Sequence, residues 1–152
     1  MKKIQLLIYG LLLSLLTVHA ADNTTRWHTY LAMYNTIAVA EAENNVYAVA
    51  DGTLYSYGKS DDNIRVYSRQ TGLSDSDVRL IRYNASTRTL VIAYSNGNID
   101  LMTSDGIYNL PFLKNTTNIQ DKTLNAIDLS GDRAYLSANF GILVIDLKKR
   151  EV

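Results

Sequence analysis

Val46-Tyr-Ala-Val-Ala-Asp-Gly-Thr-Leu-Tyr55 is one of three similar stretches in this chain of 152 residues. The other two are Leu90-Val-Ile-Ala-Tyr-Ser-Asn-Gly-Asn-Ile-Asp100 and Ala134-Tyr-Leu-Ser-Ala-Asn-Phe-Gly-Ile-Leu-Val144. Each consists of a short apolar run, a turn that contains glycine, and a second run rich in β-formers. This order is typical of two antiparallel strands joined by a tight hairpin.

The turns set the length of the repeat. Gly52, Gly97 and Gly141 are separated by 45 and 44 residues. Asp51-Gly52 and Asn96-Gly97 are strong signals for two-residue hairpins, because both central residues of a type I′ turn have positive φ. We therefore expect type I′ turns at the first two hairpins.

Further strands are expected on either side of each hairpin. Residues 36–41, 78–83 and 125–129 read as first strands, and residues 64–68 and 106–110 as fourth strands. Residues 38–43 are rich in helix formers, but Asn44-Asn45 follow at once, so we interpret them as a strand end and a turn. Four antiparallel strands every ~40 to 50 residues are typical of a β-propeller blade.

The pattern of apolar residues favours stacked sheets. The second strands, residues 46–50 and 90–94, are apolar on both faces, so another layer must cover each face. Small residues there, such as Ala48 and Ala93, suit close sheet-on-sheet packing. The strand at 64–68 alternates instead, with Ile64 and Val66 between polar residues, as expected of an outer strand partly in water.

These observations predict an all-β fold, a partial β-propeller with four-stranded antiparallel blades: two complete blades and the start of a third. Blade 1 is expected at about residues 35–70, blade 2 at about 76–112 and a partial blade 3 at about 122–152, together forming an N-terminal propeller part over residues 21–152. A propeller typically has four to eight blades. We therefore expect a fragment of a longer polypeptide or a truncated reading frame.

Residues 1–20 have the three parts of a secretory signal peptide. Lys2 and Lys3 precede an apolar stretch over residues 4–16, and Val18-His19-Ala20 resembles a cleavage site. The apolar stretch is interrupted by Gly10 and is shorter than a membrane span. We expect cleavage, no remaining transmembrane segment, and export to the periplasm or the outer-membrane surface.

Composition excludes several classes of function. Without residues 1–20, 13 basic residues face 15 acidic ones, so nothing attracts nucleic acid. The chain has no cysteine, which excludes disulfides, thiol nucleophiles and thiolate zinc sites. Its 47% hydrophobic content nevertheless predicts a packed core.

The sequence contains no convincing catalytic or binding motif, and no catalytic, cofactor-binding or metal-binding residue is predicted. His28 is interpreted as a strand residue beside Trp27. Asp75 and Asp77 lack the further ligands of a calcium loop and are interpreted as turn residues. Residues 61–62 fit a solvated loop, and most of the eleven tyrosines fit strand positions better than a sugar-stacking surface.

Several motifs resemble known propeller families. The phrase Gly72-Leu-Ser-Asp-Ser-Asp-Val78, followed by a strand and by residues 90–101, resembles the repeat of bacterial two-component-regulator propellers. The chain is similar in more detail to the N-terminal propeller of the PorZ family, an accessory component of type IX secretion in Bacteroidota. The matching segments are residues 27–34, 46–57, 98–101, 121–122 with Asn125, and 134–147.

The PorZ resemblance implies a non-catalytic interaction module in a larger surface protein, with a second propeller and a C-terminal sorting domain that this chain does not include. It implies the sortase as a partner and anionic lipopolysaccharide as a ligand to be presented for linkage to secreted cargo. It assigns no ligand-binding residue. The alternative is the periplasmic glycan-sensing propeller of a hybrid two-component regulator. A propeller enzyme would need converging acids, or a histidine and a metal, which this stretch does not offer.

Overall fold

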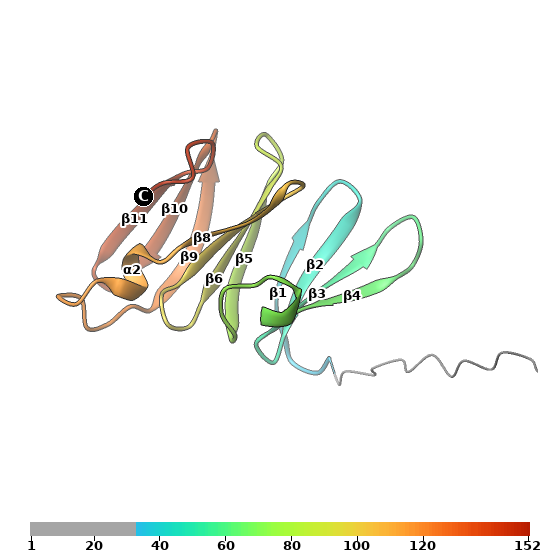
Figure 1. Cartoon of the computed structure of the whole chain (residues 1–152), viewed down its shortest axis with the longest axis horizontal. Coiled ribbons are helices and arrows are strands. Elements are labelled where there is room, and N and C mark those ends of the chain that lie inside the picture. The colour runs from blue at the N-terminus through green and yellow to red at the C-terminus, as the bar shows by residue number, and fades with distance from the viewer. Residues whose placement is uncertain (1–32) are drawn as a thin grey trace, which may run out of the picture. The chain divides into compact units, whose positions relative to one another are not determined.

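The computed structural model describes residues 33–152, which form three antiparallel sheets in chain order (Figure 1). The predicted signal peptide, Trp27 and His28 lie outside the described residues. The first sheet contains β1 (Thr36–Glu41), β2 (Asn45–Ala50), β3 (Thr53–Gly58) and β4 (Ile64–Tyr67). The second contains β5 (Val78–Asn84), β6 (Thr89–Tyr94), β7 (Ile99–Thr103) and β8 (Gly106–Leu110), and the third β9 (Leu124–Ser130), β10 (Arg133–Ala138) and β11 (Gly141–Asp146).

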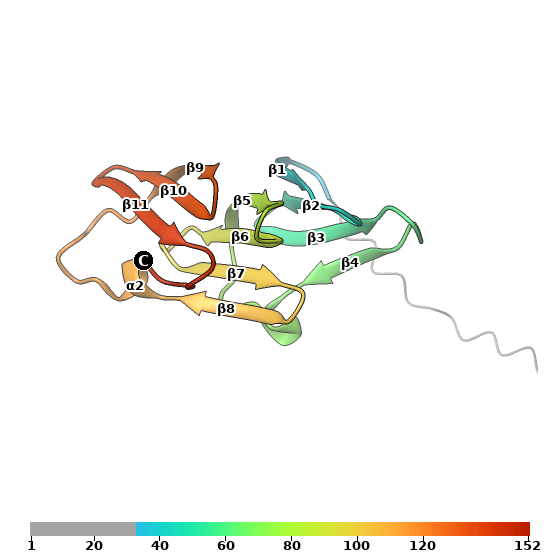
Figure 2. The same cartoon turned by 90° about the horizontal axis from the view of Figure 1, so that it is seen from above.

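Short helical turns connect the sheets: η1 (Arg69–Thr71) precedes β5, and α2 (Phe112–Asn115) follows β8. Within each sheet, neighbours in space are neighbours in sequence. Figure 2 shows β1, β5 and β9 close together along one side, with β4 and β8 on the other side. The predicted all-β partial propeller is therefore confirmed, as is the strand over residues 36–41. No helix in the described part of the chain has the length and apolar character needed to cross a membrane.

The first predicted turn is confirmed and the second is wrong. Asp51 and Gly52 both have positive φ, 47° and 74°, and join β2 to β3 as a two-residue turn. Between β6 and β7 the loop has three residues, Ser95 to Gly97, of which only Gly97 has positive φ, 80°. The Gly97 N–H donates to the Tyr94 carbonyl over 3.1 Å. This is a type I turn followed by a left-handed glycine, another common hairpin connection.

The extra loop residue changes which positions correspond between sheets. When the sheets are aligned on their hairpin glycines, Tyr47 becomes the counterpart of Ile92. Strand pairing instead makes Ala48 the counterpart of Ile92 and of Leu136. These three residues pair with residues of the first strands, namely Val39, Ile81 and Ile127. Side chains alternate between the faces of a strand, so a one-residue slip reverses every assignment of face.

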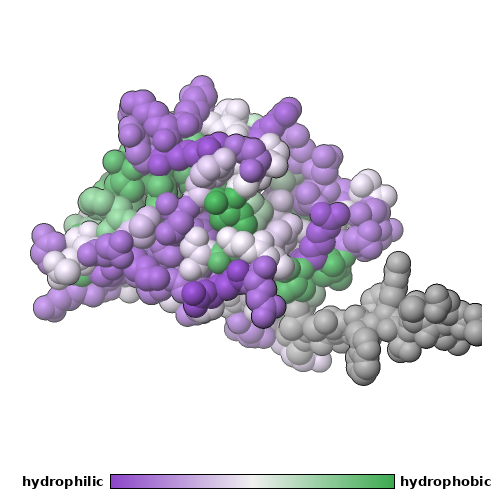
Figure 3. All heavy atoms as spheres, viewed as in Figure 1, coloured by the Kyte–Doolittle hydropathy of each residue, from purple (hydrophilic) through white to green (hydrophobic). Residues whose placement is uncertain are grey.

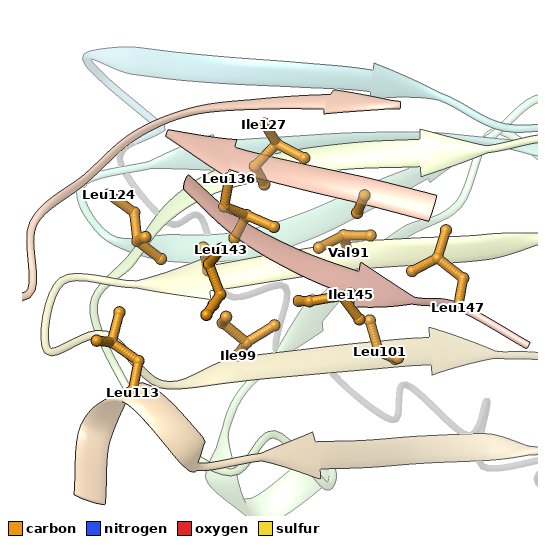
Figure 4. Close-up of a cluster of buried hydrophobic side chains, with 12 residues drawn as sticks. Val91, Ile99, Leu101, Leu113, Leu124, Ile127, Leu136, Leu143, Ile145 and Leu147 are labelled. Atoms are coloured by element: carbon orange, nitrogen blue, oxygen red, sulfur yellow. The ribbon is translucent and has the colours of Figure 1, made fainter. Parts of the chain in front are cut away.

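Two apolar clusters hold the sheets together, one on each face of the second sheet. Val49 and Leu54 of the first sheet pack with Ile92 and Met102 of the second. The other cluster joins the second and third sheets and is shown in Figure 4. All six residues of β6 are buried, so the prediction that both faces of this strand are covered is confirmed.

Strand β4 differs from the expected pattern. Ile64 is 56% exposed, although it was expected on the covered side of an outer strand. Ile64 and Val66 pair with Tyr57 and Tyr55, so they lie on the face of the first sheet that points away from the second sheet. No sheet among residues 33–152 covers that face.

The Gly97 turn generates a stability prediction. A Cβ at this position would lie 2.9 Å from Lys122 Cβ and 3.1 Å from Leu113 Cγ, and the backbone has positive φ. Gly97→Ala should therefore lower the free energy of unfolding by about 2 kcal/mol or more in urea denaturation. The matched control is Gly131→Ala, where φ is also positive but no atom lies within 4 Å, so about 1 kcal/mol is expected. Equal losses for both variants would contradict the packing argument.

Candidate functional site

The innermost strands of the three sheets line a cavity of about 290 Å³. Each of these strands contains a β-bulge near its start, with Ile37 in β1, Arg79 in β5 and Asn125 in β9 as the residue without a partner in the pairing. Bulges redirect side chains and are common beside binding sites. The lining residues come from all three sheets: Ile37, Ala38, Val39, Leu80, Ile81, Arg82, Asn125, Ala126 and Ile127.

Seven of the nine residues that line the cavity are apolar, and two have polar side chains. Arg82 is the only charged residue in its lining, and Arg82 Nε donates to the Ile127 carbonyl over 3.2 Å. Asn125 Nδ2 donates to Asn139 Oδ1 over 3.0 Å. The lining contains no carboxylate, histidine or hydroxyl nucleophile. Chemically, the cavity can bind through apolar contact, one cation and an amide, but it has no acid–base pair for catalysis.

Asp75 is part of a network of hydrogen bonds in the segment before β5. Asp75 Oδ2 accepts from Lys114 Nζ over 2.7 Å and from Asn96 Nδ2 over 2.6 Å. Partial burial opposes ionisation, but Lys114, Asn96 and the Ser76 N–H outweigh it and lower the pKa of Asp75 to about 2. Among residues 33–152, no three acidic or histidine side chains gather as they would at a metal site.

The other acidic candidates also serve turns. Asp77 has a φ of 60° and lies against Gly52, while the Val78 N–H donates to the Gly52 carbonyl over 2.8 Å. Asp61 accepts from Asn63 Nδ2 over 2.8 Å, and the Tyr57 hydroxyl donates to Asp62. These contacts fix the local backbone.

Two tyrosines illustrate how this residue type is used. The Tyr108 hydroxyl donates to Asp105 over 2.7 Å, and the Arg150 guanidinium lies 3.5 Å from the centre of the Tyr108 ring. Tyr94 is fully buried beside Asp100, which belongs to the same sheet. These rings stabilise contacts within the fold. Figure 3 shows apolar areas between hydrophilic ones on the visible face.

Asp100 is the residue that sequence reasoning missed. It is fully buried and accepts hydrogen bonds from the Ser74 N–H over 2.8 Å, from Asn109 Nδ2 over 2.8 Å and from the Tyr94 hydroxyl. Burial, and then the bond to Asp100, raise the pKa of Tyr94. Ser74 belongs to the Gly-Leu-Ser segment before β5, so Asp100 ties the connection between the first two sheets to β7. The sequence signal was an aspartate inside an apolar run, Ile99 to Met102.

A family profile described as "TSS9, PorZ, N-terminal beta-propeller domain" matches residues 46–152. The chain belongs to this PorZ propeller family. PorZ of Porphyromonas gingivalis, described as an essential bacterial surface component of the type IX secretion system, has a solved structure that is 40% identical with a TM-score of 0.76. The match covers 80% of this chain and 16% of the PorZ chain, so this PorZ-family chain spans about a sixth of that protein.

Two other solved structures are similar in fold alone. The extracellular domain of a hybrid two-component system from B. thetaiotaomicron matches with a TM-score of 0.61 and 10% identity, over 76% of this chain and 16% of that one. AztD from Citrobacter koseri matches with a TM-score of 0.53 and 14% identity, and the match covers 78% of this chain and 32% of the AztD chain. Comparison with curated proteins gives no match.

Removal of the Asp100 carboxylate should be strongly destabilising. Asp100→Ala removes the shared acceptor of the buried Tyr94 hydroxyl, the Ser74 N–H and the Asn109 side-chain amide, so the free energy of unfolding should fall by about 3 kcal/mol or more. The exposed Asp128 on β9 provides the control, since Asp128→Ala should change stability by no more than about 0.5 kcal/mol. The measurement is equilibrium urea denaturation of both variants. A small loss for Asp100→Ala would show that water replaces the carboxylate.

The depressed pKa of Asp75 predicts a pH dependence. Because its pKa is lower in the folded chain than the ordinary 3.8, the ionised carboxylate stabilises the fold above that value. This contribution should be lost as the pH falls from about 5 towards 2. The free energy of unfolding, measured across this pH range, should therefore fall more steeply for the wild type than for Asp75→Asn. Parallel curves would show that the Lys114 pair contributes nothing to stability.

Proposed function

We propose that the chain is a non-catalytic interaction module of the type IX secretion machinery, acting at the cell surface. The observation that carries this proposal is the family match over residues 46–152, together with 40% identity to a surface component of that system. The cavity between the innermost strands supports a binding role, since its lining offers contacts but no catalytic pair.

The proposal includes a ligand and a partner. Following the PorZ resemblance, the module contributes to binding anionic lipopolysaccharide and to presenting it to the sortase. The part of the chain after residue 20 has more acidic than basic residues, so an anionic glycan would need a local cation. Arg82, the one charged residue in the lining of the cavity, is available for this contact. The alternative role as a glycan sensor has support from fold similarity alone.

A segment exchange tests the proposal. Residues 33–152 would replace the matching segment of PorZ in P. gingivalis, and a second chimera would carry the matching segment of the two-component extracellular domain. The first chimera should retain secretion of cargo and its attachment to anionic lipopolysaccharide on the surface, because the two sequences are 40% identical as well as similar in fold. The second should lose both. Cargo is measured in surface and periplasmic fractions.

The level of each chimera on the cell surface serves as the control. If the first chimera reaches the surface at the wild-type level but cargo remains unattached in the periplasm, the proposed function is wrong for this segment.

A further inference from the structure

Arg82 in β5 is a residue that the repeated architecture does not require. By strand pairing it corresponds to Ala40 in β1 and to Asp128 in β9, since all three pair with equivalent residues of the second strands. Neither counterpart carries a positive charge, and Ala40 is buried in an apolar cluster. The arginine is therefore specific to the second sheet, and packing that recurs in all three sheets does not explain it.

One hydrogen bond tethers the Arg82 guanidinium. Arg82 Nε donates to the Ile127 carbonyl of β9 over 3.2 Å. Both β5 and β9 are edge strands of their sheets, and residues of both line the cavity. Because a guanidinium is planar, a bond at Nε restricts the directions in which Nη1 and Nη2 can point. Contact with the third sheet thus orients the end of this side chain before any ligand is bound.

The charge of Arg82 is not neutralised by the described part of the chain. Arg88 and Arg150 form ion pairs with carboxylates, whereas Arg82 forms none with any residue among 33–152. Asp128 directly follows Ile127, but side chains alternate along a strand, so it lies on the opposite face of β9. The N–H groups on Nη1 and Nη2 of Arg82 are therefore available to a ligand.

Asn125 adds a neutral donor from β9. Its Nδ2 donates to Asn139 Oδ1 over 3.0 Å, which leaves the second N–H of this amide without an acceptor in the described chain. The other side chains of the cavity lining are apolar, and none is a carboxylate that would compete for Arg82. A tethered guanidinium beside an amide donor suits a group with two neighbouring oxygens, which a guanidinium binds bidentately.

We propose that the cavity is a site for an oxyanionic group of the ligand, a carboxylate or a phosphate ester, bound bidentately by Nη1 and Nη2 of Arg82. Asn125 Nδ2 donates a further hydrogen bond to the same group. The inference rests on the proposed function, in which the ligand is an anionic glycan, and adds which group is recognised and how. It also makes arginine a specificity determinant, because lysine would retain the charge but not the paired donors.

Inorganic phosphate and acetate test the site without any glycan. Each is titrated into the protein expressed from the full sequence, with sodium chloride of equal ionic strength as the reference. The Nε–H signal of Arg82 in heteronuclear NMR spectra should shift to saturation with phosphate, acetate or both. The signal of Arg79 should not, since Arg79 lies on the same strand, is exposed and is outside the cavity lining. No saturable shift of Arg82 with either anion would overturn the proposal.

Anionic lipopolysaccharide from P. gingivalis is the second probe. Arg82→Lys and Arg82→Gln should both weaken its binding to the immobilised protein by about tenfold or more, because each removes the bidentate contact. Arg79→Gln is the matched control, and it should weaken binding by less than about twofold. Circular dichroism establishes that the variants are folded, as expected for substitutions at exposed positions. Wild-type binding by Arg82→Lys would show that charge alone matters, which contradicts the bidentate contact.

Chemical treatment of the lipopolysaccharide identifies the group that is bound. Hydrofluoric acid removes phosphate esters, and reduction of carboxyl groups removes carboxylates. One of the two treatments should abolish the difference between the wild type and Arg82→Gln. If the difference persists after both treatments together, Arg82 binds no oxyanion of this glycan and the proposal fails. Failure of the proposed function has another signature: phosphate or acetate shifts the Arg82 signal, yet the wild type does not bind the lipopolysaccharide.

Discussion

Apolar packing on both faces of the second sheet is the interaction on which the rest of the structure depends. The strands β5–β8 lie between two other sheets, and their side chains alternate between two separate apolar clusters. A chain without disulfides has no covalent constraint to replace this contact. The central sheet is therefore the most protected part of the described chain, and each outer sheet packs one face against it.

Polar contacts direct this packing without supplying its driving force. Asp100 lies fully buried within the second sheet and accepts three hydrogen bonds, one from the connection that arrives from the first sheet. On the other side, Asn84 Nδ2 donates to the Gly131 carbonyl over 2.8 Å and links β5 to the turn of the third sheet. A buried polar group tolerates little displacement once its partners are in place. These bonds thus fix the position of each blade relative to the next.

The same packing determines where binding can occur. Because each sheet begins with its innermost strand, β1, β5 and β9 meet and leave a cavity between them. The three bulges recur at matching positions, although their residues differ: isoleucine, arginine and asparagine. The backbone framework is thus repeated while the side chains at the bulges vary from blade to blade, and those of Ile37 and Asn125 line the cavity. A repeated scaffold that carries variable residues on its binding surface is common among binding proteins.

The sequence by itself determined the strands, the four-strand repeat and the first hairpin, because these depend on alternation, turn residues and local propensity. It also identified the PorZ family from several separate motifs. It could not give the role of Asp100, whose partners at Ser74 and Asn109 become neighbours only after folding. It also could not tell which faces are open. A third residue in the turn at Gly97 shifts the strand correspondence by one, and one residue decides whether a side chain points inward or outward. Only the tertiary structure decided that Ile64 is exposed while all six residues of β6 are buried, because burial depends on which sheet lies alongside.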